Sequence, residues 1–273
     1  MKKSFIAFLF LLALIPFQIN AQSYMEYVDS ADIKISENNW KDAEQLILKA
    51  LRLEPGNFNN SLLLSNLGYV QTQLEKYDEA IKNYSVGLSM TPNSTVLLTN
   101  RARTFLIINR NSESLADSDK ALKIDSTLIE ARRIRALSKI ALKDYNGAEV
   151  DLKYILRKDS TDADIFSSLA DCQMMLGKYH EAIKNYDKAL ALEKDERNYF
   201  NKTLLLAESK ELEKASESIK EAINLFPSSG NLYLLRAYIY KLYYRISDSE
   251  RDKKKAYELN ADPELEKLLF GTK

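Results

Sequence analysis

The stretch LGKYHEAIKNYDKALAL, residues 176–192, has a near copy earlier in the chain. Residues 74–90 read LEKYDEAIKNYSVGLSM, and ten of the seventeen positions are identical. The two copies start 102 residues apart, which is three times 34. Internal similarity at a fixed period of roughly 20–50 residues is typical of proteins built from stacked structural repeats. The spacing therefore predicts a repeat of about 34 residues.

Small residues mark this period along most of the chain. One series is spaced by 33, 34 or 37 residues: Ala43, Ala80, Ser114, Ala148, Ala182, Ala215 and Ser249. A second series lies twelve residues earlier in each repeat: Ala31, Gly68, Ala102, Ala136, Ala170, Thr203 and Ala237. Two helices whose axes are about 8–10 Å apart need small side chains where they cross. The pattern therefore predicts two antiparallel helices in each repeat.

Large apolar residues and prolines complete the repeat. Aromatic residues such as Tyr77 and Tyr179 precede the first series by three positions, and prolines such as Pro92 end a repeat where a helix must stop. In residues 66–92 the order is a small residue, then aromatic-x-x-Ala, then a terminal proline. This order resembles the tetratricopeptide-repeat family. The resemblance implies an all-α, right-handed superhelical solenoid of about seven helix-turn-helix units with a short C-terminal capping helix.

The repeat register divides the chain into segments. Residues 1–21 are set apart as a signal peptide, 22–263 form the solenoid, and 264–273 form the C-terminal cap. We place the repeats near the following ranges: 24–57, 61–94, 95–128, 129–162, 163–195, 196–229 and 230–263. The third and seventh repeats are weaker, because Asn111 and Ser249 replace the expected aromatic residue and alanine.

The start of the chain has the pattern of a secretory signal peptide. Lys2 and Lys3 precede an apolar run over residues 5–17, and Ala21 offers a small residue at the cleavage point. The alternative is an uncleaved membrane anchor, but an apolar helix of this length spans only about 20 Å of a ~30 Å hydrocarbon core. We expect cleavage after Ala21, an exported protein that is periplasmic or extracellular in a bacterial envelope, and no membrane span after cleavage.

Composition excludes several classes of partner and reaction. Without Lys2 and Lys3 the chain has 37 basic and 39 acidic residues, so no nucleic-acid partner is expected. The single histidine, His180, falls in a predicted turn, and the single cysteine, Cys172, falls in a first helix without an activating neighbour. No phosphate loop or metal-ligand spacing occurs in the sequence. We therefore predict no catalytic residues, no metal, no cofactor and no enzymatic activity.

The resemblance also implies a binding surface. In this family the first helices line a concave groove that holds extended peptides or partner helices. The residues predicted to face such a groove are Asn66, Tyr69, Gln73, Asn100, Arg103 and Arg133. The asparagine amides either hold a ligand backbone or bond to neighbouring helices, and both interpretations stay open. Arg103 and Arg133 are expected to make this half of the groove positive. The family's clamp for a C-terminal carboxylate is not found in register.

Two functions from different classes follow. The first is a non-enzymatic protein–protein interaction scaffold of the bacterial envelope, which binds a peptide or a partner protein in the groove. The alternative is a carbohydrate-binding or chaperone-like periplasmic subunit. Sugar binding requires exposed tyrosines in residues 238–244, where we expect at least two of the four tyrosines to lie in the core. The sequence predicts no particular oligomeric state.

Overall fold

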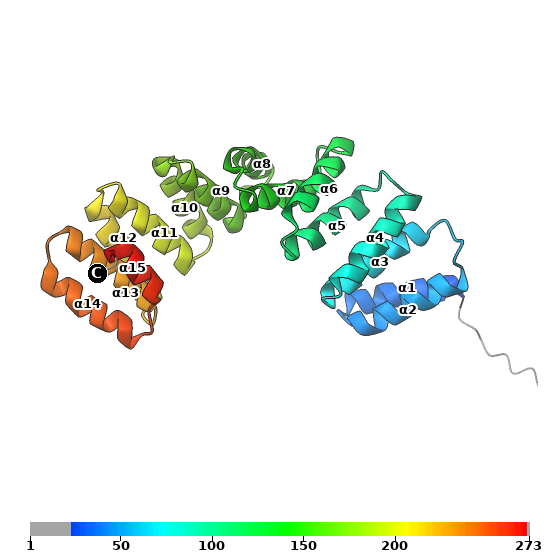
Figure 1. The fold of residues 1–273 in the computed structure, drawn as a ribbon, viewed down its shortest axis with the longest axis horizontal. Coiled ribbons are helices and arrows are strands. Elements are labelled where there is room, and N and C mark those ends of the chain that lie inside the picture. Colours follow the sequence, from blue (N-terminus) through cyan, green and yellow to red (C-terminus); the bar gives the residue numbers. More distant parts are fainter. Residues whose placement is uncertain (1–22, 272–273) are drawn as a thin grey trace, which may run out of the picture. The chain divides into compact units, whose positions relative to one another are not determined.

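The fold follows from the repeat pattern. A computed structural model describes residues 23–271, and the predicted signal peptide lies outside the described residues. All of the described secondary structure is helical, so the predicted all-α fold of stacked helix pairs is confirmed (Figure 1). The first helices of the seven repeats are α1 (Tyr24–Ser36), α3 (Asn60–Gln73), α5 (Thr95–Ile107), α7 (Ile129–Ala141), α9 (Ala163–Met175), α11 (Glu196–Glu208) and α13 (Gly230–Leu242).

Each first helix is followed by a partner of similar length. The second helices are α2 (Trp40–Leu53), α4 (Tyr77–Met90), α6 (Asn111–Ile124), α8 (Tyr145–Lys158), α10 (Tyr179–Leu192), α12 (Leu212–Leu225) and α14 (Ile246–Glu258). A short last helix, α15 (Pro263–Phe270), packs against α13. The predicted cap from residue 264 falls on this helix.

The chain divides into two compact parts, residues 23–90 and residues 91–271. We call them the N-terminal part, which holds α1–α4, and the C-terminal part, which holds α5–α15. The N-terminal part has a core around Ala43, Ile47 and Leu67. The largest core cluster of the C-terminal part gathers α10–α15 around Tyr199, Ile219 and Leu235. Each part therefore buries an apolar core of its own.

The small residues lie where the sequence analysis expects close packing. Every member of the first series is buried, from Ala43 through Ala182 to Ser249. At Ser114 and Ser249 the hydroxyl donates a hydrogen bond of 2.8 Å to a carbonyl of the facing first helix, that of Ala102 and Ala237 respectively. A serine in this series is thus as compatible with the crossing as an alanine, because its polar atom is paired.

The turn inside each repeat reverses the chain through one left-handed residue. Its φ lies between 56° and 71° at Asn38, Glu75, Asn109, Lys143, Gly177, Lys210 and Tyr244. One of these is glycine and two are asparagine, which also adopts this conformation, so the other four repeats accept a strain of about 1–2 kcal/mol to make the turn. Tyr244 is the bulkiest of them and is 89% exposed, so burial of its ring does not offset that strain.

Candidate functional site

The predicted groove residues of the N-terminal part lie on α3 and contact their neighbours. Asn66 Nδ2 donates a hydrogen bond of 3.2 Å to Asp32 Oδ1 on α1. The ring of Tyr69 meets Trp40 edge to face, with centroids 5.8 Å apart. Gln73 is exposed. Burial and the charge of Asp29 raise the pKa of Asp32, although the bond from Asn66 opposes this shift. The amide of Asn66 therefore bonds locally, to the preceding repeat.

In the C-terminal part, Asn100, Arg103 and Arg133 form one chain of contacts through Glu130. Arg103 Nη1 donates to Asn100 Oδ1 and its Nη2 donates to Glu130 Oε1, both at 3.0 Å. Arg133 Nε lies 3.9 Å from Glu130 Oε2, and its Nη2 donates to Asp162 Oδ2 at 2.6 Å. The structure thus brings the three predicted residues of this part together across α5 and α7.

This chain of contacts alternates in charge. Burial tends to raise the pKa of Asp162, but the bond from Arg133 and backbone N–H groups lower it below the ordinary value, so the carboxylate stays charged. Each arginine is therefore balanced by an acid, Arg103 by Glu130 and Arg133 by Asp162. The expected positive surface is wrong, because sequence alone did not reveal which acids the folding of α5, α7 and α9 would place beside these arginines.

A cavity of about 340 Å³ adjoins this chain of contacts. We call it the α5–α7 pocket, and it is lined by Thr95, Val96, Thr99, Asn100, Leu128, Ile129, Glu130 and Ala131. Val96 is 54% exposed although it is apolar. Ligand pockets of roughly 300–1,000 Å³ combine apolar walls with a few polar groups, as this one does. Its size and lining suit an apolar side chain whose backbone meets Asn100 and Glu130 at the rim.

Sequence reasoning did not find the apolar wall of this pocket. A signal was available, because Val96 lies six residues before the small residue of its first helix, as do Met25 and Leu62 in the two preceding repeats. All three side chains are more than half exposed.

Asn201 lies two residues before the small residue of its first helix, as Asn66 and Asn100 do, and it also bonds locally. Asn201 Nδ2 donates to Asp171 Oδ1 at 3.3 Å, and Arg197 Nη1 donates to Asp171 Oδ2 at 2.8 Å. The hydroxyl of Tyr186 donates to Asp171 as well. Of the two interpretations left open for the asparagines, local bonding is thus the one seen at Asn66, Asn100 and Asn201.

None of the four tyrosines of residues 238–244 is fully buried, although Tyr238 packs against the edge of the core. Tyr238 is half-buried against Phe270, with ring centroids 6.1 Å apart, and Tyr240 lies beside the guanidinium of Arg245. Tyr243 and Tyr244 are exposed. The expectation of two core tyrosines is wrong, because the core positions of α13 are filled by its aliphatic residues Leu232, Leu235 and Ile239.

The remaining reactive residues show no activated chemistry. His180 is exposed, and its Nδ1 lies 3.9 Å from Glu211. Burial, with the charges of Asp171 and Glu149, raises the pKa of the Cys172 thiol to about 12. Within residues 23–271, no cluster of three or more His, Cys, Asp or Glu could hold a metal ion, and no helix is long and apolar enough to cross a bilayer.

Comparison with known proteins agrees with this architecture. Residues 63–94 and 139–205 match family models described as tetratricopeptide repeat. A tetratricopeptide repeat protein from Parabacteroides merdae is 27% identical, with a TM-score of 0.65 over 91% of this chain and 97% of that one. The chain therefore contains tetratricopeptide repeats, which serve as protein-interaction scaffolds.

Two further similarities show how widely this architecture is shared. YrrB, described as a TPR protein with an unusual peptide-binding site, is 19% identical, with a TM-score of 0.58 over 67% of this chain and 95% of that one. The DnaJ homolog subfamily C member 7 homolog of Schizosaccharomyces pombe is 33% identical over 123 residues, 44% of this chain and 25% of that protein. The chain spans about a third or less of the length of the curated relatives it matches.

Proposed function

We propose that this chain of tetratricopeptide repeats is a non-enzymatic scaffold that binds an extended segment of a partner protein along its first helices. The observation that carries the proposal is the α5–α7 pocket, where the exposed apolar side chain of Val96 adjoins the polar rim of Asn100 and Glu130. An apolar side chain of the partner enters the pocket, and the partner's backbone meets the rim.

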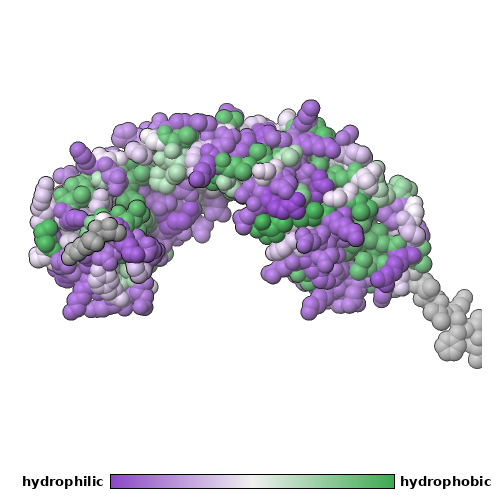
Figure 2. Space-filling model, in the orientation of Figure 1, coloured by the Kyte–Doolittle hydropathy of each residue, from purple (hydrophilic) through white to green (hydrophobic). Residues whose placement is uncertain are grey.

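The charges around the pocket narrow the choice of partner. Glu130 and Asp162 already accept the hydrogen bonds of Arg103 and Arg133. Both arginines are thus neutralised by acids of this chain, and Val96, Leu128 and Ile129 give the pocket an apolar lining, so it favours an uncharged, apolar segment. The face drawn in Figure 2 is mixed, with hydrophobic areas scattered among hydrophilic ones, which suits contact at a few anchor points.

We also propose that the protein acts outside the cytoplasm, in a bacterial envelope, after removal of residues 1–21. The support is the order of Lys2 and Lys3, the apolar run and Ala21, together with the similarity to a bacterial repeat protein over most of the chain. Mass spectrometry of the protein purified from its native host tests this point, and a mature N-terminus at Gln22 is the expected result.

Val96→Asp tests the binding site. A charge in the apolar wall has no partner there, so we expect capture of the partner from native envelope extract to fall at least about tenfold, a loss of about 1.4 kcal/mol. Val150→Asp is the matched control, because Val150 is exposed on α8 and does not line the pocket. The amount of each captured protein is measured by quantitative mass spectrometry with residues 22–273 as bait.

The same experiment separates the alternative function. Equal capture by the wild type and Val96→Asp would contradict binding in the α5–α7 pocket. The second candidate is carbohydrate binding, which the exposure of Tyr243 and Tyr244 favours. If an envelope polysaccharide is retained, and is lost with Tyr244→Ala but not with Val96→Asp, the carbohydrate alternative replaces the peptide proposal.

A further inference from the structure

One position of the second helices carries an amide or a carboxylate in five of the seven repeats. It lies three residues after the small crossing residue and is occupied by Asn83, Asp117, Asp151, Asn185 and Asp252. Four of these residues are fully or almost fully buried, and Asn83 is half-buried. We call this the filling position, because its side chain closes the space between the two helices of the repeat.

Each filling residue is bonded to the first helix of its own repeat. Arg101 Nε donates to Asp117 Oδ2 at 2.6 Å, Arg135 Nε to Asp151 Oδ2 at 2.8 Å, and Arg236 Nε to Asp252 Oδ2 at 2.5 Å. The arginine precedes the aspartate by sixteen residues in all three.

The two amides of the filling position follow a second scheme. Asn83 and Asn185 each donate at 2.7 Å to a glutamine of the first helix, Gln71 and Gln173 respectively. The filling residue is thus paired in every repeat from the second to the fifth and in the seventh.

The sixth repeat keeps only half of this pairing. In the third, fourth and seventh repeats an arginine stands sixteen residues before the filling position, and in the sixth repeat Lys202 takes this place. The filling residue of the sixth repeat, however, is Ser218. The hydroxyls of Ser218 and Thr203 bond each other at 2.7 Å. Lys202 Nζ instead reaches Asp187 Oδ1 on α10, at 2.6 Å. The Lys202 side chain is 18% exposed, whereas that of Asp187 is 53% exposed.

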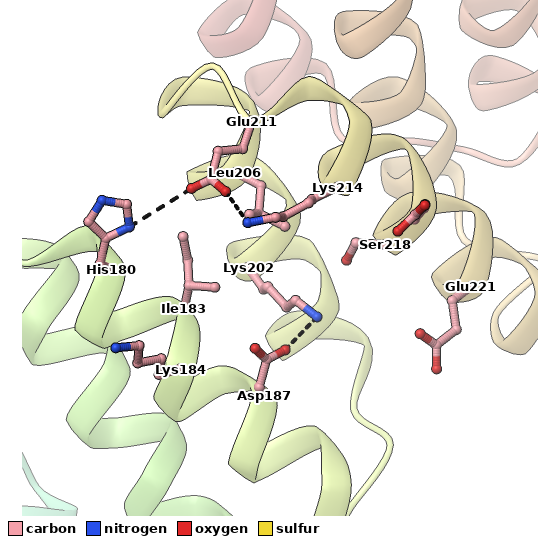
Figure 3. A pocket seen from close by; sticks show the side chains of 11 residues that line it. His180, Ile183, Lys184, Asp187, Lys202, Leu206, Glu211, Lys214, Ser218 and Glu221 are labelled. Atoms are coloured by element: carbon pink, nitrogen blue, oxygen red, sulfur yellow. Dashed lines mark hydrogen bonds and ion pairs between the residues drawn. The ribbon is translucent and has the colours of Figure 1, made fainter.

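A hollow of about 700 Å³ opens where the filling residue is small. We call it the α10–α12 hollow. Figure 3 shows it between α10, which contributes Ile183 and Lys184, and the helices α11 and α12, which contribute Leu206 and Ser218. Ile183 and Leu206 give it apolar surface, and Lys184 on α10 and Glu217 on α12 are among its charged lining residues. Within residues 23–271, neither Lys184 nor Glu217 forms an ion pair or a side-chain hydrogen bond.

We propose that the α10–α12 hollow is a second docking site, and that it takes a helical segment of a partner protein with an acidic side chain directed at Lys202. The chain itself supplies the template, because Asp117, Asp151 and Asp252 meet a basic residue at the same place in their repeats. In the sixth repeat the carboxylate comes from the partner, and it replaces the exposed Asp187 at Lys202.

The rest of the hollow defines the partner further. Glu217 on α12 has no cation of its own, so the proposed segment carries a Lys or Arg for Glu217 in addition to its acidic residue. Residues four apart on a helix lie about 5–6 Å from each other on one face, which lets one helix present both charges. Small apolar residues between them cover Ile183 and Leu206. This surface is separate from the α5–α7 pocket, so one chain can hold two partners.

The probe is a fluorescein-labelled, alanine-based helical peptide with Glu and Lys four residues apart, about 16 residues long so that it exceeds the ~12–15 residues at which isolated helices are marginal. We expect it to bind the full mature chain at least about tenfold more tightly than the analogue with Gln for Glu, as measured by fluorescence anisotropy. Equal binding of the two peptides, or no binding of either, would overturn the proposal.

Ser218→Asp is the decisive variant, because it restores the filling carboxylate. It should raise the melting temperature and weaken binding of the Glu peptide at least about tenfold. Ser216→Asp is the matched control, since it makes the same change on α12 outside the hollow. Lys202→Ala should also abolish the preference for Glu over Gln. Unchanged peptide binding by Ser218→Asp would refute the site, while capture that depends on Val96 would be unaffected.

Discussion

Replacing Asp151 with alanine is expected to lower the free energy of unfolding of the C-terminal part by about 3–5 kcal/mol. The carboxylate is fully buried and accepts from Arg132 Nη1 at 3.1 Å, Arg135 Nη2 at 2.5 Å and Lys139 Nζ at 2.9 Å. Removal of one acid therefore leaves three largely buried cations without their shared partner. Urea denaturation followed by circular dichroism measures the change.

The control is Asp119→Ala, which removes an exposed acid from the same arginine. Asp119 accepts one hydrogen bond of 2.9 Å from Arg135, and its side chain is 52% exposed, so we expect a loss of less than about 1 kcal/mol. Similar losses for Asp151→Ala and Asp119→Ala would contradict the account of the buried cluster.

The same cluster should be visible in the pH dependence of stability. Burial by itself raises the pKa of Asp151, but Arg135 and Lys139 lower it below the ordinary value. A group whose pKa is lower in the folded state stabilises the fold above its unfolded pKa, about 3.9, and loses that contribution as the pH falls toward the folded value. The stability difference between the wild type and Asp151→Asn should therefore be constant near neutral pH and shrink below about pH 4.

Ala182→Leu is expected to cost about 1–3 kcal/mol through overpacking. Ala182 is fully buried at the crossing of α9 and α10, where the register leaves space for a methyl group only. Thermal unfolding of residues 22–273 measures the loss. Glu181→Leu places the same side chain on the exposed side of α10 and should be nearly neutral. An unchanged melting temperature for Ala182→Leu would mean that this residue does not form the crossing.

The helix pairs could be predicted because their cause is local and periodic. A small residue every 34 positions, flanked by large apolar residues at helical spacing, allows only closely crossing helices, and the burial of Ala43, Ala182 and Ser249 agrees with that. The identical residues of the two quoted segments also have equivalent bonds. Lys76 and Asn83 in one copy, and Lys178 and Asn185 in the other, join matching networks with a glutamine and a glutamate.

The candidate site could be predicted only in part. The register placed Asn100, Arg103 and Arg133 on first helices, and the structure links them. The charge of the surface around them was mispredicted, because the acids that neutralise Arg103 and Arg133 lie 27 and 29 residues further along the chain, respectively. A long side chain can reach several neighbours, and the one it reaches depends on how adjacent repeats pack.

The sequence by itself determined the repeat length, the helix pairs and the crossing residues of this protein, because each depends on contacts within about one repeat. Only the tertiary structure decided which acids neutralise Arg103 and Arg133, that Val96 walls a pocket, and that a hollow lies beside Ser218, where five other repeats have Asn or Asp. These features arise between helices of different repeats. Their geometry is set by the packing of whole helices, to which many residues contribute and which no single motif encodes.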